Sequence, residues 1–249
     1  VYTVHNIAQK EATPSDQKIN RFLFRRMGVV PVALSEEVRQ TIVDVYHLNP
    51  KEIPIACNGI PMERCNPCSA YQKTATNYIH VGRFCEVKNH ANLIRGFVKA
   101  HEQYPTIQLR LYGDGPLRQK MENLAAELQA QDFIHFMGLT DDVYSAMAKA
   151  DVFILPSIYE GMPMTLIEAM ATGLPIITTP VGGIVDMLED GKEAAFTGTD
   201  PASIAEGISS LVENLALRQT LGQAARIKAK QFSAEAMAKK YLEIYSEGI

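Results

Sequence analysis

Two cations, Arg83 and Lys88, stand five residues apart in the segment VGRFCEVKN, directly after an apolar stretch typical of a buried strand. Arginine offers a planar fork of hydrogen-bond donors and lysine a mobile point charge. Together they are suited to neutralise the negative charge that grows on a departing diphosphate. On spacing alone, the alternative of a solvated arginine and lysine in a surface loop stays open.

Two glutamates, Glu160 and Glu168, bracket seven residues in SIYEGMPMTLIEAMATGLPII, which follows the apolar segment VFILP. Proline is tolerated in the first turn of a helix but not in its interior, so a helix is predicted to begin at Pro163 or Met164. Backbone amides from Gly161 onward and the positive end of the helix dipole then suit a phosphate or sugar hydroxyls. Taken singly, each glutamate could equally be a solvated carboxylate.

Two further turns are rich in glycine. In YGDGPLRQKME, Gly113 and Gly115 lie between a predicted strand and a helix, but Arg118 takes the place of the third glycine of G-x-G-x-x-G. A dinucleotide site is therefore only weakly supported. In TTPVGGIVDML, Gly182 and Gly183 allow a close backbone approach, although a plain turn explains them equally well.

These segments need a scaffold that brings them together. Short apolar runs alternate with stretches of helical period, which is typical of a parallel sheet with crossover helices, and the fold class is α/β with a Rossmann-like sheet. Strands are expected at 1–5, 29–35, 52–57, 77–82, 107–113, 133–138, 152–157 and 174–179, and a short element is expected near 194–198. Helices are expected at 15–27, 36–47, 91–104, 116–129, 143–150, 164–172 and from 202 to the end, with breaks near Leu217 and at Ser233.

The chain is expected to divide where periodicity is lost, between Gly59 and Thr76. The expected parts are the end of one Rossmann-like domain, a linker, a second Rossmann-like domain and a C-terminal helix that packs back toward the first domain: 1–60, 61–76, 77–230 and 231–249. Because the chain opens with Val1 in a strand-like segment, we expect it to be a fragment.

Composition excludes several classes. The chain has 249 residues, 47% of them apolar and 21% charged, which is typical of a globular protein. A net charge of -4 leaves no broad basic surface, so no nucleic-acid partner is expected. There is no apolar run of about 20 residues and no signal pattern, so a cytoplasmic protein is expected.

Cys65 and Cys68 form a C-x-x-C motif, which supplies only half of the ligands of a zinc site, and a structural role is favoured for this pair.

One predicted helix has a basic face. In KINRFLFRRMG, Lys18, Arg21, Arg25 and Arg26 alternate with apolar residues at helical spacing. A helix packed on its own domain with a charged outer face is the favoured interpretation. The alternative is peripheral contact with an anionic membrane, at its inner face.

In order and spacing, VGRFCEVKN, YGDGPLRQKME, FMGLTDDV and EGMPMTLIEAMATGLPII resemble the family 4 retaining glycosyltransferases, of the group 1 type and the two-domain GT-B architecture. ALSEEV and the NGI at 58–60 extend the resemblance to roughly residues 29 to 249, and the E-x7-E segment is its most diagnostic part. It implies a hexosyltransferase that moves a sugar from a nucleoside-diphosphate sugar to an acceptor hydroxyl and keeps the anomeric configuration. Synthesis of a cell-surface glycan, glycolipid or polysaccharide is the expected setting.

The resemblance also implies roles for particular residues. Arg83 and Lys88 would hold the donor diphosphate, and Glu168 would hydrogen-bond the ribose. Glu160 would lie beside the donor sugar, and His5 would reach the cleft from the first domain, so these two join the cations as catalytic candidates. The other donor-binding candidates contact the donor through their backbone or border its base: Gly82, Gly113, Met137, Gly138, Gly161, Met162, Pro163, Met164, Thr165 and Leu166.

The sequence contains no Asp-x-Asp tripeptide, the metal-holding signature of the other large glycosyltransferase fold, so neither a metal nor a cofactor is expected. Two alternative functions stay open, a sugar-nucleotide epimerase of the same architecture and a non-catalytic nucleotide-binding module.

The sequence departs from the family pattern in two ways. The glycine-rich acceptor side of the family is absent, and the segment DGKEAAFTG lacks a second glycine that family members usually have there. We therefore expect this chain alone to bind a donor without transferring the sugar. Base, sugar and acceptor stay open.

Overall fold

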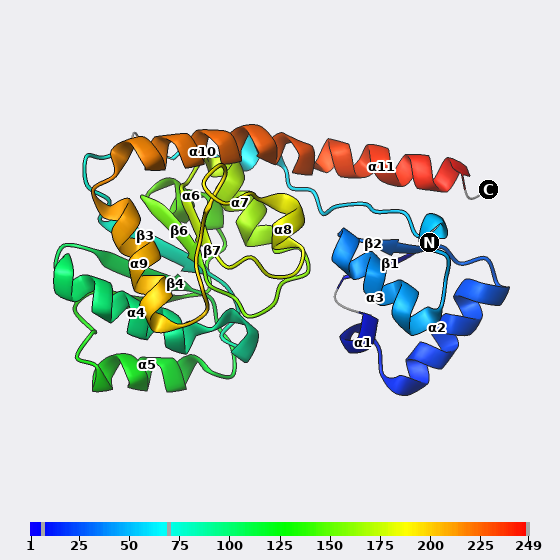
Figure 1. Ribbon diagram of the computed structural model, residues 1–249, viewed down its shortest axis with the longest axis horizontal. Coiled ribbons are helices and arrows are strands. Elements are labelled where there is room, and N and C mark those ends of the chain that lie inside the picture. Colours follow the sequence, from blue (N-terminus) through cyan, green and yellow to red (C-terminus); the bar gives the residue numbers. More distant parts are fainter. Residues whose placement is uncertain (6–7, 69–70, 248–249) are drawn as a thin grey trace.

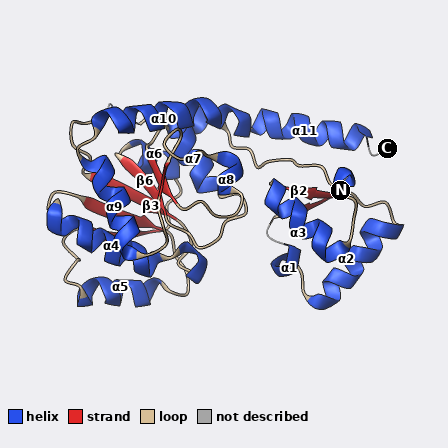
Figure 2. Cartoon of the chain, in the orientation of Figure 1, coloured by secondary structure: helices blue, strands red, loops and turns tan. Residues whose placement is uncertain are grey.

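The computed structural model describes residues 1–5, 8–68 and 71–247 (Figure 1), and helices alternate with strands along most of this length (Figure 2). The strands are β1 (Tyr2–Val4), β2 (Pro31–Ala33), β3 (Asn77–Val81), β4 (Gln108–Tyr112), β5 (Ile134–Gly138), β6 (Val152–Leu155), β7 (Ile176–Thr178) and β8 (Ala195–Phe196). The α-helices are α1 (Ala8–Glu11), α2 (Pro14–Arg26), α3 (Glu36–Tyr46), α4 (His90–Gln103), α5 (Arg118–Glu127), α6 (Val143–Ala148), α7 (Met164–Thr172), α8 (Ile184–Met187), α9 (Pro201–Val212), α10 (Leu215–Ala229) and α11 (Ala234–Glu247). Within these ranges, no helix is long and apolar enough to cross a membrane.

Strands β3 to β8 form one parallel sheet in the order β5-β4-β3-β6-β7-β8. The chain extends the sheet from β3 through β4 to β5 and then returns to the other side of β3 with β6. This reversal makes the carboxyl ends of β3 and β6 the switch point of the sheet, which is where open α/β sheets bind ligands. The loop with Arg83 and Lys88 follows β3, and the loop with Glu160 follows β6.

Two apolar layers cover the faces of this sheet. One layer contains buried side chains of α6 and α7, and the other contains those of α4 and α9. All four residues of β6 are buried, which is typical of a central strand in a parallel sheet. The strand ends are therefore held by a rigid core, and the loops that follow them are positioned by it.

A smaller unit precedes this sheet and is built on the parallel pair β1 and β2. Its core includes Phe24 of α2 and Tyr46 of α3, whose rings meet edge to face with centroids 5.0 Å apart. Helix α11 reaches back to this unit (Figure 1), where the hydroxyls of Tyr241 and Thr3 share a hydrogen bond of 2.7 Å. Ser233 caps α11, since its Oγ accepts from the amide of Ala236 at 3.1 Å.

The structure corrects three expectations. The strand expected at 52–57 is wrong, because only Ile55 bridges to Ala33 and Pro54 has no N–H to extend the ladder. The break expected near Leu217 lies at 213–214, where the Asn214 side chain accepts from the Leu217 amide. Helix α1 was not expected. Residues 69–70 of the expected linker and 248–249 of the expected last helix lie outside the described residues.

Candidate functional site

The loop after β3 carries one exposed cation, Arg83, and one half-buried cation, Lys88. Phe84 is fully buried and anchors the loop, and its amide donates to the carbonyl of Asp114 at 3.0 Å. Asn89 closes the loop in the left-handed conformation, and its side-chain amide donates to the carbonyls of Pro156 and Thr199. Arg83 is exposed, whereas Lys88 is half-buried at the end of the 3₁₀ helix η3 (Glu86–Lys88).

Glu160 is paired with Lys88 across the switch point. Its Oε1 lies 2.6 Å from the Lys88 Nζ and also accepts from the Ser157 hydroxyl at 2.5 Å. The side chains of Lys88 and Glu160 are only 16% and 10% exposed. The interpretation of Glu160 as a solvated carboxylate is therefore wrong, and the structure joins two of the predicted catalytic residues directly.

Helix α7 begins as predicted, with Pro163 at its N-cap and Met164 as its first residue. No side chain caps this end, and the Thr165 hydroxyl is buried without a hydrogen-bond partner among the described residues. The amides of the first turn and the helix dipole are therefore available to an anion. Met162 is fixed from the other unit, since the Asn58 side-chain amide donates to its carbonyl at 3.3 Å.

The glycine turn after β7 packs directly on the Glu160 loop. The amide of Gly183 donates to the carbonyl of Glu160 at 3.0 Å. Gly182 has a φ of 57°, and a Cβ at this position would collide with the same carbonyl. The close backbone approach that the sequence allowed is therefore present. It fixes the backbone of the residue that carries the buried carboxylate.

Replacing Gly182 by alanine is expected to destabilise the fold by about 3 kcal/mol, because strain at positive φ adds to the collision. Gly191→Ala is the matched control, since Gly191 has a φ of 71° but nothing within 4 Å of its Cβ position. This control should lose only about 1 kcal/mol. Urea unfolding measures the free energy of unfolding of both variants. Equal losses in Gly182→Ala and Gly191→Ala would contradict the close approach of Gly182 to the Glu160 carbonyl.

Glu168 lies on the second turn of α7, and its surroundings differ from those of Glu160. Its side chain is half-buried between α6 and the linker. Burial raises the pKa of Glu168 to about 7, while a hydrogen bond from Tyr144 and the charge of Arg64 act in the opposite direction. Among the described residues, no hydrogen bond or ion pair joins the Glu168 side chain to Lys88 or Glu160, and its role at the ribose stays a prediction.

A groove of about 540 Å³ opens beside Arg83 at the ends of β3 and β4. Its lining includes Gly82, Gly113 and the exposed Leu139. Met137 is 45% exposed at the end of β5, and the guanidinium of Arg118 lies against Gly138. The candidates for the diphosphate and the base thus lie along one edge of the sheet.

The first unit closes over this edge. The carbonyl of His5 lies 3.2 Å from where a Cβ of Gly161 would be, so His5 reaches the Glu160 loop. On α8, the carboxylate of Asp186 accepts from the amide of Glu36 at the N-terminus of α3, at 3.0 Å. The structure therefore places the backbone of His5 beside the loop that carries Glu160.

Two buried histidines beneath the β3 loop were missed by sequence reasoning. The Nδ1 of His80 lies 2.9 Å from the carbonyl oxygen of Ile154, and burial lowers the pKa of His80 to about 4. The ring of His90 stacks on Phe84 at 4.1 Å, and burial lowers its pKa to about 2. Both imidazoles are neutral near pH 7 and so add no charge beside Lys88. No sequence signal distinguishes such residues from exposed histidines.

Cys65 and Cys68 pack as neutral thiols. Burial raises the pKa of Cys65 to about 11 and also raises that of Cys68. The Cys68 thiol donates to the carbonyl of Gly173 at 3.5 Å, and both cysteines are free. Within the part of the chain that the structure describes, no group of three His, Cys, Asp or Glu side chains could hold a metal.

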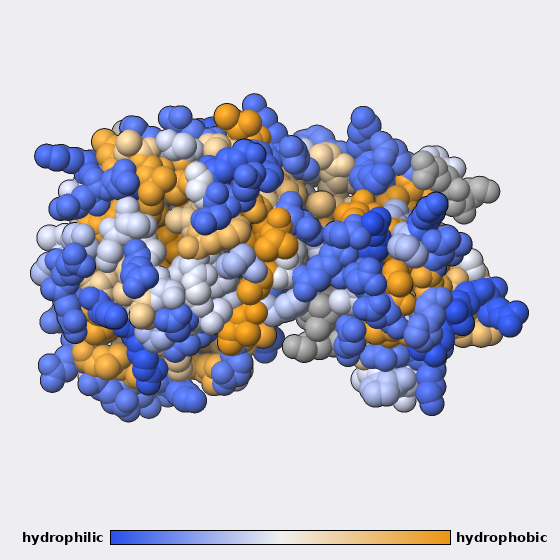
Figure 3. Space-filling view, viewed as in Figure 1, coloured by the Kyte–Doolittle hydropathy of each residue, from blue (hydrophilic) through white to orange (hydrophobic). Residues whose placement is uncertain are grey.

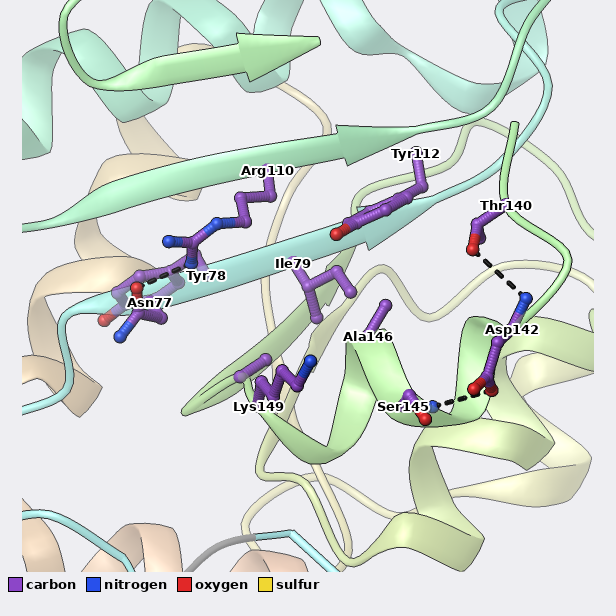
Figure 4. Close-up of a pocket in the computed structure, with 11 residues that line it drawn as sticks. Asn77, Tyr78, Ile79, Arg110, Tyr112, Thr140, Asp142, Ser145, Ala146 and Lys149 are labelled. Atoms are coloured by element: carbon purple, nitrogen blue, oxygen red, sulfur yellow. Dashed lines mark hydrogen bonds between the residues drawn. The ribbon is translucent and has the colours of Figure 1, made fainter. Parts of the chain in front are cut away.

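A separate cavity of about 420 Å³ lies between the sheet and α6 (Figure 4). It is lined by Arg110, Tyr112 and Lys149 among others, and it contains none of the predicted donor residues. Asp142 at its rim caps α6, because its Oδ1 accepts from the Ser145 amide at 3.0 Å. This cavity therefore lies apart from the predicted donor residues.

The chain resembles known glycosyltransferases in sequence. It is 29% identical over 245 residues to the putative glycosyltransferase EpsF of Bacillus subtilis, an alignment that covers 93% of this chain and 62% of that protein. It is 31% identical over 169 residues to the N-acetyl-alpha-D-glucosaminyl L-malate synthase of Bacillus anthracis, covering 67% of this chain and 44% of that enzyme. The chain thus spans less than two thirds of the length of these relatives.

Solved structures share the fold. Anabaena Alr3699/HepE in complex with UDP has a TM-score of 0.88 at 18% identity, covering 99% of this chain and 71% of that one. TarM of S. aureus has a TM-score of 0.84 at 20% identity, covering 98% and 50%. The expected GT-B fold is confirmed. Residues 69–228, more than half of the chain, match the model of the glycosyl transferases group 1, and the chain belongs to this family.

Proposed function

We propose that this chain is the donor-binding part of a family 4 retaining glycosyltransferase that takes a nucleoside-diphosphate sugar. The observation that carries the proposal is the convergence, at one switch point, of Arg83, the Lys88–Glu160 pair and the uncapped end of α7. Cations and free amides suit a diphosphate, and a buried carboxylate beside them suits sugar hydroxyls. The names of the relatives and the UDP and UDP-glucose bound to HepE support this choice.

In the proposed reaction, the acceptor hydroxyl attacks from the same face that the diphosphate leaves. Arg83, Lys88 and the α7 dipole neutralise the leaving diphosphate, and one of its oxygens helps to take the acceptor proton. Glu160 orients the donor sugar, and His5 lies near the reacting carbon. Because these groups supply the positive charge, we propose that the reaction needs neither a metal nor a cofactor.

We propose a uridine nucleotide as the first donor to test and a glycan or lipid hydroxyl as acceptor, in the synthesis of a cell-surface polysaccharide. A titration of this chain with UDP, GDP and ADP should show a clear preference for one base. Product analysis with the full-length protein then separates three outcomes. A new glycoside supports the transferase, a changed donor sugar indicates an epimerase, and unchanged donor indicates a binding module.

Peripheral contact with an anionic membrane stays a second proposal, for α2. Ile19 and Phe22 are 58% and 57% exposed on this helix, yet Arg21 and Arg25 donate to carbonyls at the end of α3. In the face shown in Figure 3, hydrophilic side chains dominate over α2. Arg26→Glu should reduce co-sedimentation with phosphatidylglycerol vesicles, and unchanged or absent co-sedimentation would remove the membrane proposal.

A further inference from the structure

Strand β4 is apolar on one face only. Leu109 and Leu111 are fully buried in the layer that contains α4 and α9, whereas Gln108, Arg110 and Tyr112 alternate with them and are only partly buried. A strand inside a parallel sheet that is covered by helices on both faces normally presents apolar side chains to both. All four residues of β6, two strands away, follow this rule. The face of β4 on the side of α6 therefore departs from an ordinary core surface.

This polar face forms one wall of the cavity of about 420 Å³. Ile79 of β3 lines the cavity beside Arg110 and Tyr112, and Ala146 and Lys149 line it from α6 and its C-cap. Pockets that bind small molecules have volumes of about 300–1,000 Å³, whereas one water molecule occupies about 30 Å³. The cavity therefore has room for a small molecule.

The guanidinium of Arg110 is held in place by an asparagine. Its Nη1 donates to the Oδ1 of Asn77 at 2.6 Å (Figure 4). Asn77 is fixed in turn, because its side-chain nitrogen and its backbone amide both donate to the carboxylate of Asp151, at 3.3 and 2.8 Å. A guanidinium has five N–H donors, so most of those of Arg110 remain available. Among the described residues, no carboxylate forms an ion pair with Arg110.

Two further donors line the same cavity. Figure 4 shows the side chains of Arg110 and Tyr112 on the same side of the sheet, and the amino group of Lys149 directed toward Ile79. In the part of the chain that the structure describes, neither the Tyr112 hydroxyl nor the Lys149 amino group has a hydrogen bond or an ion pair with another residue. The cavity is thus lined by three kinds of donor whose natural partner is an acceptor from outside the chain.

The charges around the cavity favour an anion. Arg110 and Lys149 are both positive, and Asp142 is the only carboxylate among the residues that line the cavity. Asp142 is already engaged, because its Oδ1 caps α6 by accepting from the Ser145 amide at 3.0 Å. A phosphate monoester carries a charge of about −1.5 to −2 at pH 7, which balances two cations. A guanidinium can also donate to two phosphate oxygens at once.

We propose that this cavity binds the phosphoryl group of a small phosphorylated molecule, with Arg110 and Lys149 neutralising its charge and Tyr112 donating a hydrogen bond. Free phosphate and a sugar phosphate share this chemistry. The lining contains none of the predicted donor residues, so this site is separate from the groove beside Arg83. The inference therefore does not depend on the proposed function.

The test is calorimetric titration of this chain with ribose 5-phosphate, inorganic phosphate and ribose at pH 7.5, above the second pKa of a phosphate monoester of about 6. Ribose 5-phosphate should bind with a Kd of about 1 mM or below, and ribose should not bind. Tighter binding of ribose 5-phosphate than of inorganic phosphate would assign the site to a sugar phosphate, and equal binding would assign it to free phosphate.

Arg110→Gln and Lys149→Gln should each weaken the binding of ribose 5-phosphate by about tenfold. Lys149 is exposed, so Lys149→Gln keeps the fold even where Arg110→Gln destabilises the sheet. Lys120→Gln is the matched control, because Lys120 is an exposed lysine on α5, away from the cavity. This control should bind ribose 5-phosphate as the wild type does.

Arg83→Ala separates the cavity from the donor groove, where a phosphate could also meet a cation. Binding of ribose 5-phosphate should survive Arg83→Ala, and binding of UDP should survive Lys149→Gln. Loss of ribose 5-phosphate binding in Arg83→Ala with normal binding in Lys149→Gln would overturn the inference, as would no binding of ribose 5-phosphate or phosphate at about 10 mM. If ribose 5-phosphate binds as predicted but UDP does not bind, the proposed function fails while this inference stands.

Discussion

Arg83→Ala is expected to weaken the binding of nucleoside diphosphates by about 30- to 150-fold without unfolding the chain. Charge-assisted, bidentate hydrogen bonds to phosphate contribute about 2–3 kcal/mol, which corresponds to this range. Because Arg83 is exposed at the end of β3, its loss leaves no buried group unpaired. Isothermal titration calorimetry with the preferred diphosphate measures the change.

Arg95→Ala is the control for this variant, since Arg95 is also an exposed arginine but lies on the outer part of α4. It should bind the nucleotide as the wild type does. If Arg83→Ala binds within threefold of wild type, Arg83 does not contact the diphosphate. A strong loss in both variants would indicate a general charge effect instead of a site.

Lys88→Ala is expected to destabilise the fold by about 3 kcal/mol as well as to weaken nucleotide binding. Removing one partner of a buried ion pair leaves the other charge uncompensated, and Glu160 would keep only its hydrogen bond from Ser157. The double variant Lys88→Ala, Glu160→Gln should recover most of the stability, because it removes the stranded charge. Nucleotide binding should stay weak in both. Urea unfolding and calorimetry measure the two effects separately.

An exposed pair provides the comparison. Lys192 lies 3.0 Å from Glu189, but these side chains are 60% and 66% exposed, so Lys192→Ala should change stability by no more than about 0.5 kcal/mol. A loss of less than about 1 kcal/mol in Lys88→Ala, with no recovery in the double variant, would show that the Lys88–Glu160 pair is not the structural centre of the site.

The fold was largely predictable because its signals are local. The apolar run VFILP indicates a buried strand by itself, and Pro163 sets the start of α7 by itself. The strand predicted at 52–57 shows where such local signals fail. Its apolar pattern is typical of a strand, but Pro54 has no N–H, and the segment forms only a single bridge to β2 instead of a ladder.

The chemistry of the site was predictable only in part, because it depends on which strands become neighbours. Placing β6 beside β3 brings Lys88 within 2.6 Å of Glu160, although 72 positions separate them, and spacing alone left both as solvated side chains. The contact of Arg64 with Tyr144 is equally non-local and carries no motif. The candidate residues could be predicted from their types, but their contacts depend on the order of the strands in the sheet.

A crystal structure of this chain with UDP tests the central claim most directly. We predict diphosphate oxygens within hydrogen-bond distance of Arg83, Lys88 and the first-turn amides of α7, with the base along the ends of β4 and β5. A nucleotide bound without contact to Arg83, for example in the cavity beneath α6, would contradict the proposed donor site.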